Sequence, residues 1–352
     1  MRLVSPLLKH AVYPALHHIG LLDRITPLGD CAFVNYHGLI PSDHSGGDIF
    51  LDGNLLQPDV FRKQLQFLKA RYNLIHPEDF RASIEQARPL PPRPALVTCD
   101  DGLLNSLTDM LPVLQSEGVS CLFFVTAASC GANPGMLWYE ELYELMRIQP
   151  LSESYSHLPL EEGAEPPPSA SFQARWWSTI RRASRLDLES RADWMAQVRA
   201  HCPHLPDFPS ERRWHLLTAS GLKQLADAGM TIGAHTLSHP VLSLCSEQES
   251  RREIQQSKQD LERILGQPVW AFAYPFGNPS TMGEREMRLA REAGFACAFL
   301  NVEHWGNGNS SGYERSDLFA LPRTHVTSNT TLPEFAAHLS GLHTRLQRAV
   351  GG

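Results

Sequence analysis

Strand-like and helix-like patterns alternate along most of this chain of 352 residues. Runs of residues that suit buried strands are predicted at 31–36, 73–75, 95–98, 119–126, 230–233, 269–273, 295–300 and 319–322. Segments with apolar residues at helical spacing lie between them, at 58–70, 77–86, 104–117, 218–228, 247–265, 282–293 and 333–350. So regular an alternation predicts an α/β fold built on a parallel sheet or barrel.

The alternation is interrupted between residues 131 and about 215. Three helical patterns lie in this region, at 137–147, 172–185 and 189–201. Because the alternation resumes directly afterwards, we interpret the region as an insertion into one domain, 31–345, rather than as a second domain. Residues 1–30 form an N-terminal amphipathic extension, which either packs on the outside of the domain or makes peripheral contact with a membrane.

Two adjacent carboxylates, Asp100 and Asp101, follow the strand predicted at 95–98, with Cys99 in between. Adjacent charges repel, so the pair is easier to explain if a cation neutralises one carboxylate while the other transfers protons. Downstream, His235 and His239 have the i, i+4 spacing that places two imidazoles on one face of a helical turn. One carboxylate and two histidines leave a coordination position for water, which is the pattern of a catalytic metal site.

These residues also have structural explanations. The two aspartates can cap the helix that starts near residue 104, and the two histidines can form a buried pair at a helix start. His37 either lines the mouth of a site or closes a turn. Four aromatic residues of the inserted region either stack on a sugar ring or anchor the inserted helices: Trp138, Tyr139, Trp176 and Trp177. Four arginines there form a solvated helix face or contact the phosphate of a lipid-linked sugar: Arg175, Arg181, Arg182 and Arg185.

Composition narrows the class of protein. The formal net charge of −7, without a stripe of lysine and arginine, argues against a nucleic-acid binder. The seven cysteines are an odd number without a Cys-x-x-Cys pair, so we interpret them as buried thiols in a reducing compartment. Neither a signal peptide nor a transmembrane run of about 18 apolar residues is predicted. We therefore expect a cytoplasmic location.

Three motifs occur in order along the chain: Thr98-Cys-Asp-Asp-Gly102, His235-Thr-Leu-Ser-His239-Pro and Tyr274-Pro-Phe-Gly277. With these motifs the sequence resembles the NodB-type polysaccharide deacetylases, carbohydrate esterase family 4, over most of residues 30–345 except the insertion. The resemblance implies a distorted (β/α) barrel with its site at the carboxyl ends of the strands, which agrees with the alternation of elements.

The resemblance also implies roles for individual residues. Asp101, His235 and His239 would bind a divalent metal, usually zinc, although the same ligands suit cobalt and nickel. Asp100 would be the general base that deprotonates the water on the metal, whose pKa zinc lowers to about 7. The backbone N–H of Phe276 would donate to the oxyanion of the tetrahedral intermediate.

The sequence departs from the family pattern at two places. Ala273 stands where the family usually has an arginine that orients the catalytic aspartate, and Leu321-Pro-Arg-Thr-His325 replaces a Leu-x-His motif whose histidine protonates the leaving amine. We hypothesise that Arg323 orients Asp100, with His325 or His304 as the acid. The competing explanation is a weakened acid and a substrate with a better leaving group.

The function predicted is a metal-dependent hydrolase that removes acetyl groups from N-acetylated sugars, either a polysaccharide or a lipid-linked glycan. We expect it in the cytoplasm or at the inner face of the membrane. Three alternatives stay open on the same site: an O-acetyl esterase, a deacylase of a small amide, and a carbohydrate-binding protein that retains the metal without turnover.

Overall fold

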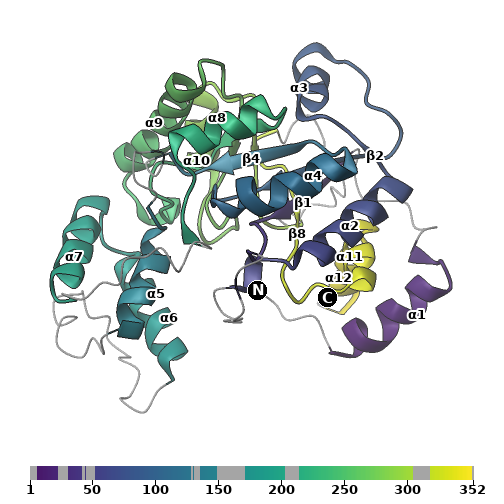
Figure 1. Ribbon diagram of the computed structural model, residues 1–352, viewed down its shortest axis with the longest axis horizontal. Helices are drawn as coiled ribbons and strands as arrows, with labels where there is room; N and C mark the ends of the chain where they lie inside the picture. The colour runs from purple at the N-terminus through teal and green to yellow at the C-terminus, as the bar shows by residue number, and fades with distance from the viewer. Residues whose placement is uncertain are drawn as a thin grey trace.

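A parallel sheet lies at the centre of the molecule (Figure 1). The computed structural model describes residues 6–22, 31–41, 44, 52–127, 130, 135–148, 171–202, 214–303 and 318–350. Its strands are β1 (Ala32–Tyr36), β2 (Asn73–Leu74), β3 (Pro94–Cys99), β4 (Cys121–Val125), β5 (Thr231–Ala234), β6 (Ala271–Ala273), β7 (Cys297–Phe299) and β8 (Thr324–His325). Their order is β7-β6-β5-β4-β3-β1-β8, with β2 paired to β3 beside this path, and the pairs are parallel. The predicted α/β fold with a parallel sheet is confirmed.

The two ends of this path approach each other through residues 321–325. Leu321 forms a parallel bridge with Phe299 of β7, and β8 then pairs with β1. The sheet is therefore curled toward a barrel, and one short segment borders both of its edges.

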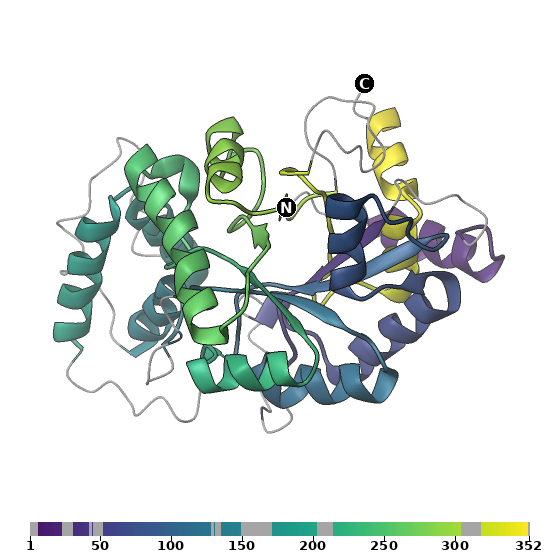
Figure 2. The same ribbon diagram turned by 90° about the horizontal axis from the view of Figure 1, so that it is seen from above.

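Helices cover the outer face of the curled sheet (Figure 2). They are α2 (Pro58–Arg71), α4 (Leu111–Glu117), α8 (Ala219–Asp227), α9 (Glu247–Leu265), α10 (Glu284–Glu292), α11 (Leu332–Leu339) and α12 (Leu342–Val350). In contrast, α3 (Pro77–Gln86) packs its Phe80 against Phe33 and Phe299 of the inner face. The sequence marks both ends of α9: Ser246 and Glu249 form a capping box, and Gly266 ends the helix with a φ of 67°. Its bounds coincide with the predicted 247–265.

Two predicted helices differ from the structure. The helix predicted at 104–117 begins as a π-helical turn, η4 (Ser106–Met110), before α4. Pro112 lacks the N–H that would bond to residue 108, which favours the wider turn. The helix predicted at 333–350 is divided into α11 and α12, because Gly341 between them has a φ of 70°.

The last strand is also displaced. A strand at 319–322 is wrong, since this segment contributes the bridge at Leu321 and the strand β8 comes three residues later. Pro322 cannot donate to a ladder, so regular pairing begins beyond it. This displacement places Arg323 and His325, rather than the residues before them, at the site described below.

The inward face of the strands is apolar at depth and polar at the carboxyl ends. A buried apolar cluster takes alternate residues from six segments of the sheet: Phe33, Leu96, Leu122, Phe124, Ala271, Ala273, Cys297, Phe299 and Leu321. Because side chains on a strand alternate with a period of two, the next residues on the same face are Asn35, Thr98 and Arg323, all of which are buried. His37, Asp100 and His325 follow them. The period-two register thus places the candidate chemistry at the carboxyl end of the sheet.

The N-terminal residues pack beside the C-terminal helices. A π-helical turn, η1 (Leu8–Val12), leads into α1 (Tyr13–His18), which lies against α11. The buried Tyr13 hydroxyl contacts His343 Nδ1 at 2.6 Å, and Lys9 Nζ lies 3.1 Å from Glu334 Oε2. In the described part of the chain, helices are either too short or too polar to span a bilayer.

The region of the predicted insertion contains α5 (Trp138–Ile148), α6 (Phe172–Ala183) and α7 (Leu188–Ala200). These helices lie together at one side of the sheet, on the opposite side from α1 and α12 (Figures 1 and 2). They have their own apolar cluster, which also includes Leu55, Leu103 and Trp214 from segments near the sheet. The helices therefore form a small lobe beside the carboxyl ends of the strands, and the domain boundaries around it stay a prediction.

Candidate active site

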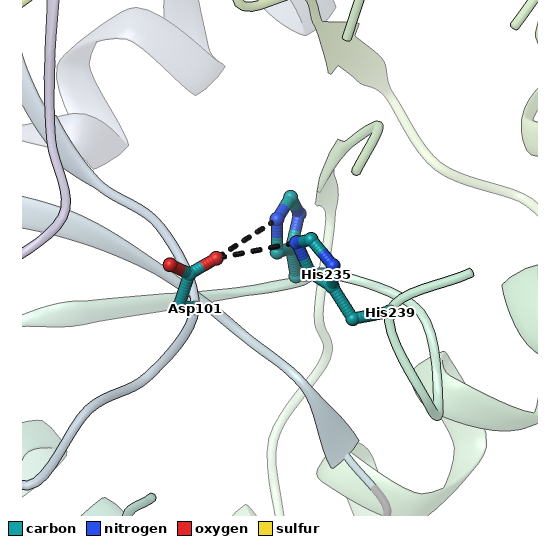
Figure 3. A group of neighbouring side chains, drawn as sticks. All are labelled: Asp101, His235 and His239. Atoms are coloured by element: carbon teal, nitrogen blue, oxygen red, sulfur yellow. Dashed lines mark ion pairs between the residues drawn. The ribbon is translucent and has the colours of Figure 1, made fainter. Parts of the chain in front are cut away.

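Asp101, His235 and His239 come together in the structure (Figure 3). His235 Nε2 and His239 Nε2 lie 3.5 and 3.3 Å from the same oxygen, Asp101 Oδ1. All three side chains are buried, and one ligand atom from each lies within 4.8 Å of the others. The residues that the sequence predicts as metal ligands thus form one cluster.

This cluster fits a tetrahedral metal ion. Two ligand atoms that are each about 2.0–2.1 Å from a tetrahedral zinc ion are about 3.3 Å apart, close to the observed 3.3 and 3.5 Å. Asp101 Oδ1 is buried without a hydrogen-bond partner in the described ranges. A buried carboxylate oxygen left in this way is costly unless a cation takes it. His235 Nδ1 contacts the Ala273 carbonyl at 2.8 Å, so its Nε2 is free to act as a ligand.

The histidines are held by a loop and not by the predicted helical turn. Residues 235–241 after β5 have no regular structure, and Thr236 and His239 have φ values of 66° and 56°. The buried Glu253 of α9 accepts hydrogen bonds from the N–H groups of Leu237 and Ser238, both at 2.9 Å. This carboxylate fixes the loop, so the two imidazoles converge without a helix.

Asp100 lies beside the cluster in a bidentate pair with Arg323. Arg323 Nη1 donates to Asp100 Oδ1 at 2.7 Å and Nη2 to Oδ2 at 2.6 Å. Both side chains are almost fully buried, and Arg323 Nε donates to the Leu300 carbonyl at 2.6 Å. The guanidinium also lies 5.3 Å from the ring centroid of Phe124. Arg323 therefore occupies the orienting position toward Asp100 that the sequence hypothesis gave it.

Burial and charge act in opposite directions on the two carboxylates. Burial alone would raise the pKa of Asp100, but Arg323 and then His235 outweigh it and lower that pKa. Burial would also raise the pKa of Asp101, but the adjacent His235 and His239 lower this pKa well below its usual range. Since both carboxylates bind these partners, they do not cap the following helix. The capping explanation of the pair is therefore wrong.

Phe276 lies at the same cavity with a φ of 60°. Its ring centroid is 4.9 Å from that of His239, and its N–H has no acceptor within the residues that the structure describes. The next residue, Gly277, allows the backbone of Asn301 to pack closely against this segment, because a Cβ at position 277 would lie 2.4 Å from Asn301 N. A free backbone donor beside the metal ligands matches the oxyanion position that the resemblance implies.

Two further imidazoles, His37 and His325, lie at the cavity with ring centroids 4.9 Å apart. His37 therefore lines the site. Burial, and then the nearby His37, lower the pKa of His325 to about 3. His304, the other proposed acid, lies outside the described residues.

One cavity of about 570 Å³ contains these groups. Its second half is walled by the helical lobe and neighbouring segments, through Leu55, Leu103, Tyr139, Trp176, Trp177, Ile180 and Trp214. Trp176 belongs to the apolar cluster of the lobe, whereas Trp177 is 45% exposed. Trp138 packs under the Arg191 guanidinium at 4.6 Å. The four aromatic residues thus divide between anchoring the lobe and facing the cavity.

Three residues of the site were not predicted: Asn35, Glu253 and Asn301. Asn35 accepts from Arg323 and donates to both Asp100 and Asn301. A polar residue inside the apolar run 31–36 was a signal for it, because a buried amide needs partners. Glu253 and Asn301 carried no such signal, since a glutamate on a surface helix and an asparagine after a strand are ordinary.

Comparison with known proteins supports the resemblance to the polysaccharide deacetylases. Residues 194–298 match the family model of the polysaccharide deacetylases. The predicted resemblance is confirmed. A curated protein of Bacillus subtilis (strain 168), YxkH, whose name assigns it to the polysaccharide deacetylases, is 23% identical over 128 residues. This alignment covers 36% of the chain and spans 43% of that relative.

Solved structures of deacetylases share the fold. The Streptococcus pyogenes deacetylase PplD, in complex with acetate, is 16% identical with a TM-score of 0.55, over 89% of this chain and 99% of that one. IcaB from Ammonifex degensii is 18% identical with a TM-score of 0.54, over 90% and 98% of the two chains. The curled parallel sheet is thus the NodB-like (β/α) barrel that the resemblance implied.

Proposed function

We propose that this chain is a metal-dependent hydrolase that removes acetyl groups from N-acetylated sugars. One observation carries the proposal: a carboxylate–histidine–histidine set that can hold a metal and an aspartate held by a buried arginine share one cavity. The family match and the shared fold support a deacetylase. Zinc is the ion we propose, with cobalt and nickel as the other ions that suit these ligands.

Each group at the cavity has its own role in the proposed hydrolysis. A divalent metal on Asp101, His235 and His239 supplies Lewis acidity, which acidifies water and polarises an acyl carbonyl. Asp100 accepts the proton of the attacking water, and its lowered pKa keeps it ionised at neutral pH. Arg323 holds both oxygens of Asp100, so the carboxylate keeps one orientation toward the cavity. The Phe276 N–H donates to the oxyanion that forms on the acetyl oxygen.

The leaving group takes its proton from an imidazole at the cavity. His325 and His37 are the candidates among the described residues, and His325 is the one we propose. The carbon–nitrogen bond of the acetamide breaks as this proton reaches the amine, which releases acetate and the free amino sugar.

An O-acetyl esterase is the second candidate function, because one observation favours it. Burial, and then the nearby His37, lower the pKa of His325 to about 3, so its imidazole is neutral at pH 7 and must take up a proton before it can act as a general acid. An alkoxide leaving group needs less protonation than an amine, so an ester substrate would depend less on this histidine. Retention of a metal without turnover is less favoured, because Arg323 reaches Asp100 and His325 reaches the cavity.

The walls of the cavity support a carbohydrate substrate. Exposed aromatic faces such as that of Trp177 pack well against the apolar face of a sugar ring. A lipid-linked carrier, with peripheral membrane contact, stays part of the proposal. A cytoplasmic location is also proposed, and the seven buried cysteine thiols are consistent with a reducing compartment.

Acetate release tests the proposal. The zinc-loaded protein and its Asp100→Asn variant would be assayed with N-acetylated oligosaccharides, nucleotide- and lipid-linked N-acetyl sugars, and O-acetylated sugars. We expect release from an N-acetylated sugar that depends on Asp100. Release from O-acetylated sugars alone would favour the esterase, and no release from a protein that holds one zinc ion would contradict both.

A further inference from the structure

The Arg323 guanidinium and the side-chain amides of Asn35 and Asn301 form a hydrogen-bonded chain beside Asp100. Their donors and acceptors determine which way each amide is oriented. Arg323 can only donate hydrogen bonds, and the ionised Asp100 can only accept them. Arg323 Nη1 lies 2.9 Å from one end of the Asn35 amide, and Asp100 Oδ2 lies 2.8 Å from the other end. Asn35 must therefore present its oxygen to Arg323 and its amino group to Asp100.

This orientation determines that of Asn301. The second hydrogen of the Asn35 amino group points to the Asn301 side chain at 3.0 Å, so Asn301 must accept through Oδ1. Its own amino group, Nδ2, is then the donor that remains. Within the described ranges Nδ2 has no acceptor, although Asn301 lines the cavity.

The backbone of Asn301 is also held in place. Its N–H donates to the Gly277 carbonyl at 2.8 Å, directly after the proposed oxyanion donor Phe276. Asn301 Oδ1 and Asp100 Oδ2 both accept a hydrogen bond from the Asn35 amino group. Two acceptors that share one amino group in this way lie about 5 Å apart. Asn301 is thus held through both its side chain and its backbone, and it connects the hydrogen-bond network of Asp100 to the segment that follows Phe276.

We propose that Asn301 Nδ2 donates a hydrogen bond to a hydroxyl oxygen of the sugar unit that carries the acetyl group. This inference rests on the proposed function. It makes Asn301 a specificity-determining residue, which favours substrates with an oxygen acceptor next to the acetylated position. A rigid donor of this kind selects against a substrate without the oxygen, because the amino group would lose its hydration without a replacement.

Substrates that lack single oxygens test the inference. The probe is di-N-acetylchitobiose, with analogues in which one hydroxyl group of the acetylated unit is replaced by hydrogen. kcat/KM for acetate release is measured with the zinc-loaded wild type, Asn301→Ala and Asn301→Asp. We expect Asn301→Ala to lower kcat/KM for the parent sugar about tenfold, equivalent to about 1.4 kcal/mol. One deoxy analogue should show the same loss with the wild type and no further loss with the variant.

Two controls separate substrate contact from damage to the site. Asn301→Asp keeps an acceptor for the Asn35 amino group but removes the proposed donor to the sugar. Its kcat/KM should therefore fall at least as far as that of Asn301→Ala, with zinc content unchanged. Asn329→Ala, at an exposed asparagine outside the cavity, should resemble the wild type.

The outcomes distinguish this inference from the proposed function. If the wild type releases acetate and Asn301→Ala loses the same factor on every analogue, or nothing on any, Asn301 makes no specific contact and the inference is wrong. If the wild type releases no acetate from the disaccharide, the proposed function fails for this sugar and the inference fails with it.

Discussion

Replacing Arg323 with alanine removes the counter-ion of a carboxylate that is 1% exposed. Arg323 makes two hydrogen bonds to Asp100 and further bonds to Asn35, Thr98 and the Leu300 carbonyl. Removing one partner of a buried ion pair destabilises a protein by about 3–5 kcal/mol, because the other charge stays buried. We expect a loss of stability of this size at pH 7, measured by urea unfolding.

The pH dependence of this loss has a definite sign. In the wild type the pKa of Asp100 is lowered by folding, so the pair stabilises above the unfolded pKa of about 3.9 and this contribution is lost as the pH falls through the lower folded value. Arg323→Ala removes the largest influence that lowers the pKa of Asp100, so we expect the pKa of this buried carboxyl to be higher in the variant. As the pH falls, Asp100 of the variant takes up a proton and no longer carries a buried, unpaired charge. The difference in unfolding free energy between variant and wild type should therefore shrink between pH 7 and pH 4.

The same variant tests the orienting role. Zinc content should stay near one ion per chain, because Arg323 contacts none of the three ligands. Acetate release should fall by about 10²–10⁴-fold, the range that a general base contributes. Arg263→Ala, which removes an exposed partner of Asp260, should change stability by less than about 1 kcal/mol.

Two variants make the test robust. Adding Asp100→Asn to Arg323→Ala removes the uncompensated charge, so the double variant should be more stable at pH 7 than Arg323→Ala alone. A loss of stability that is equal at pH 7 and pH 4, turnover near the wild-type rate, or loss of zinc together with Arg323 would each refute this account of the pair.

Three further predictions concern other parts of the molecule. Glu253→Ala removes the acceptor of two loop N–H groups, so zinc affinity in a chelator competition should fall about 10–100-fold. Unchanged affinity would show that the loop keeps its conformation without Glu253. Trp177→Ala should lower kcat/KM for oligosaccharides more than for a monosaccharide, and Trp177→Phe should keep part of the wild-type kcat/KM. Equal losses on both sugars would argue against stacking. His338 faces Glu303, Glu334 and the ring of His343; against the effect of burial, Glu303 and Glu334 raise its pKa to about 9. The raised value contributes about 3 kcal/mol that is fully present below pH 6.5 and lost as the pH rises through about 9, so unfolding of His338→Leu and wild type should converge at pH 10.

Much of the fold follows from local signals in the chain. Helix α9, which is capped by Ser246 and ends before Gly266, is predicted to the residue. Elements whose limits depend on long-range pairing are not: β8 begins at Thr324 because Pro322 cannot pair and because β1 is the neighbouring strand. The bounds of the inserted lobe depend on packing against Leu55 and Leu103, which no local pattern reveals.

The candidate site divides in the same way. Residues within motifs, Asp100, Asp101, His235 and His239, were found together, although the two histidines lie on a loop held by Glu253 and not on a helical turn. Arg323 could be proposed only because Ala273 cannot supply a charge to Asp100. Asn35 and Asn301 complete the network through contacts between strands β1 and β3 and the end of β7, and sequence spacing does not carry such contacts.

A zinc titration of the metal-stripped protein is the sharpest test of the proposed metal-dependent deacetylation. Bound zinc and acetate release from an N-acetylated oligosaccharide are measured in the same samples. We expect acetate release to rise in proportion to bound zinc and to saturate at one ion per chain. With His239→Ala, which should bind zinc weakly, we expect no release at any point. Release that is unchanged in the metal-stripped protein, or one tightly bound zinc ion without release, would contradict the proposal.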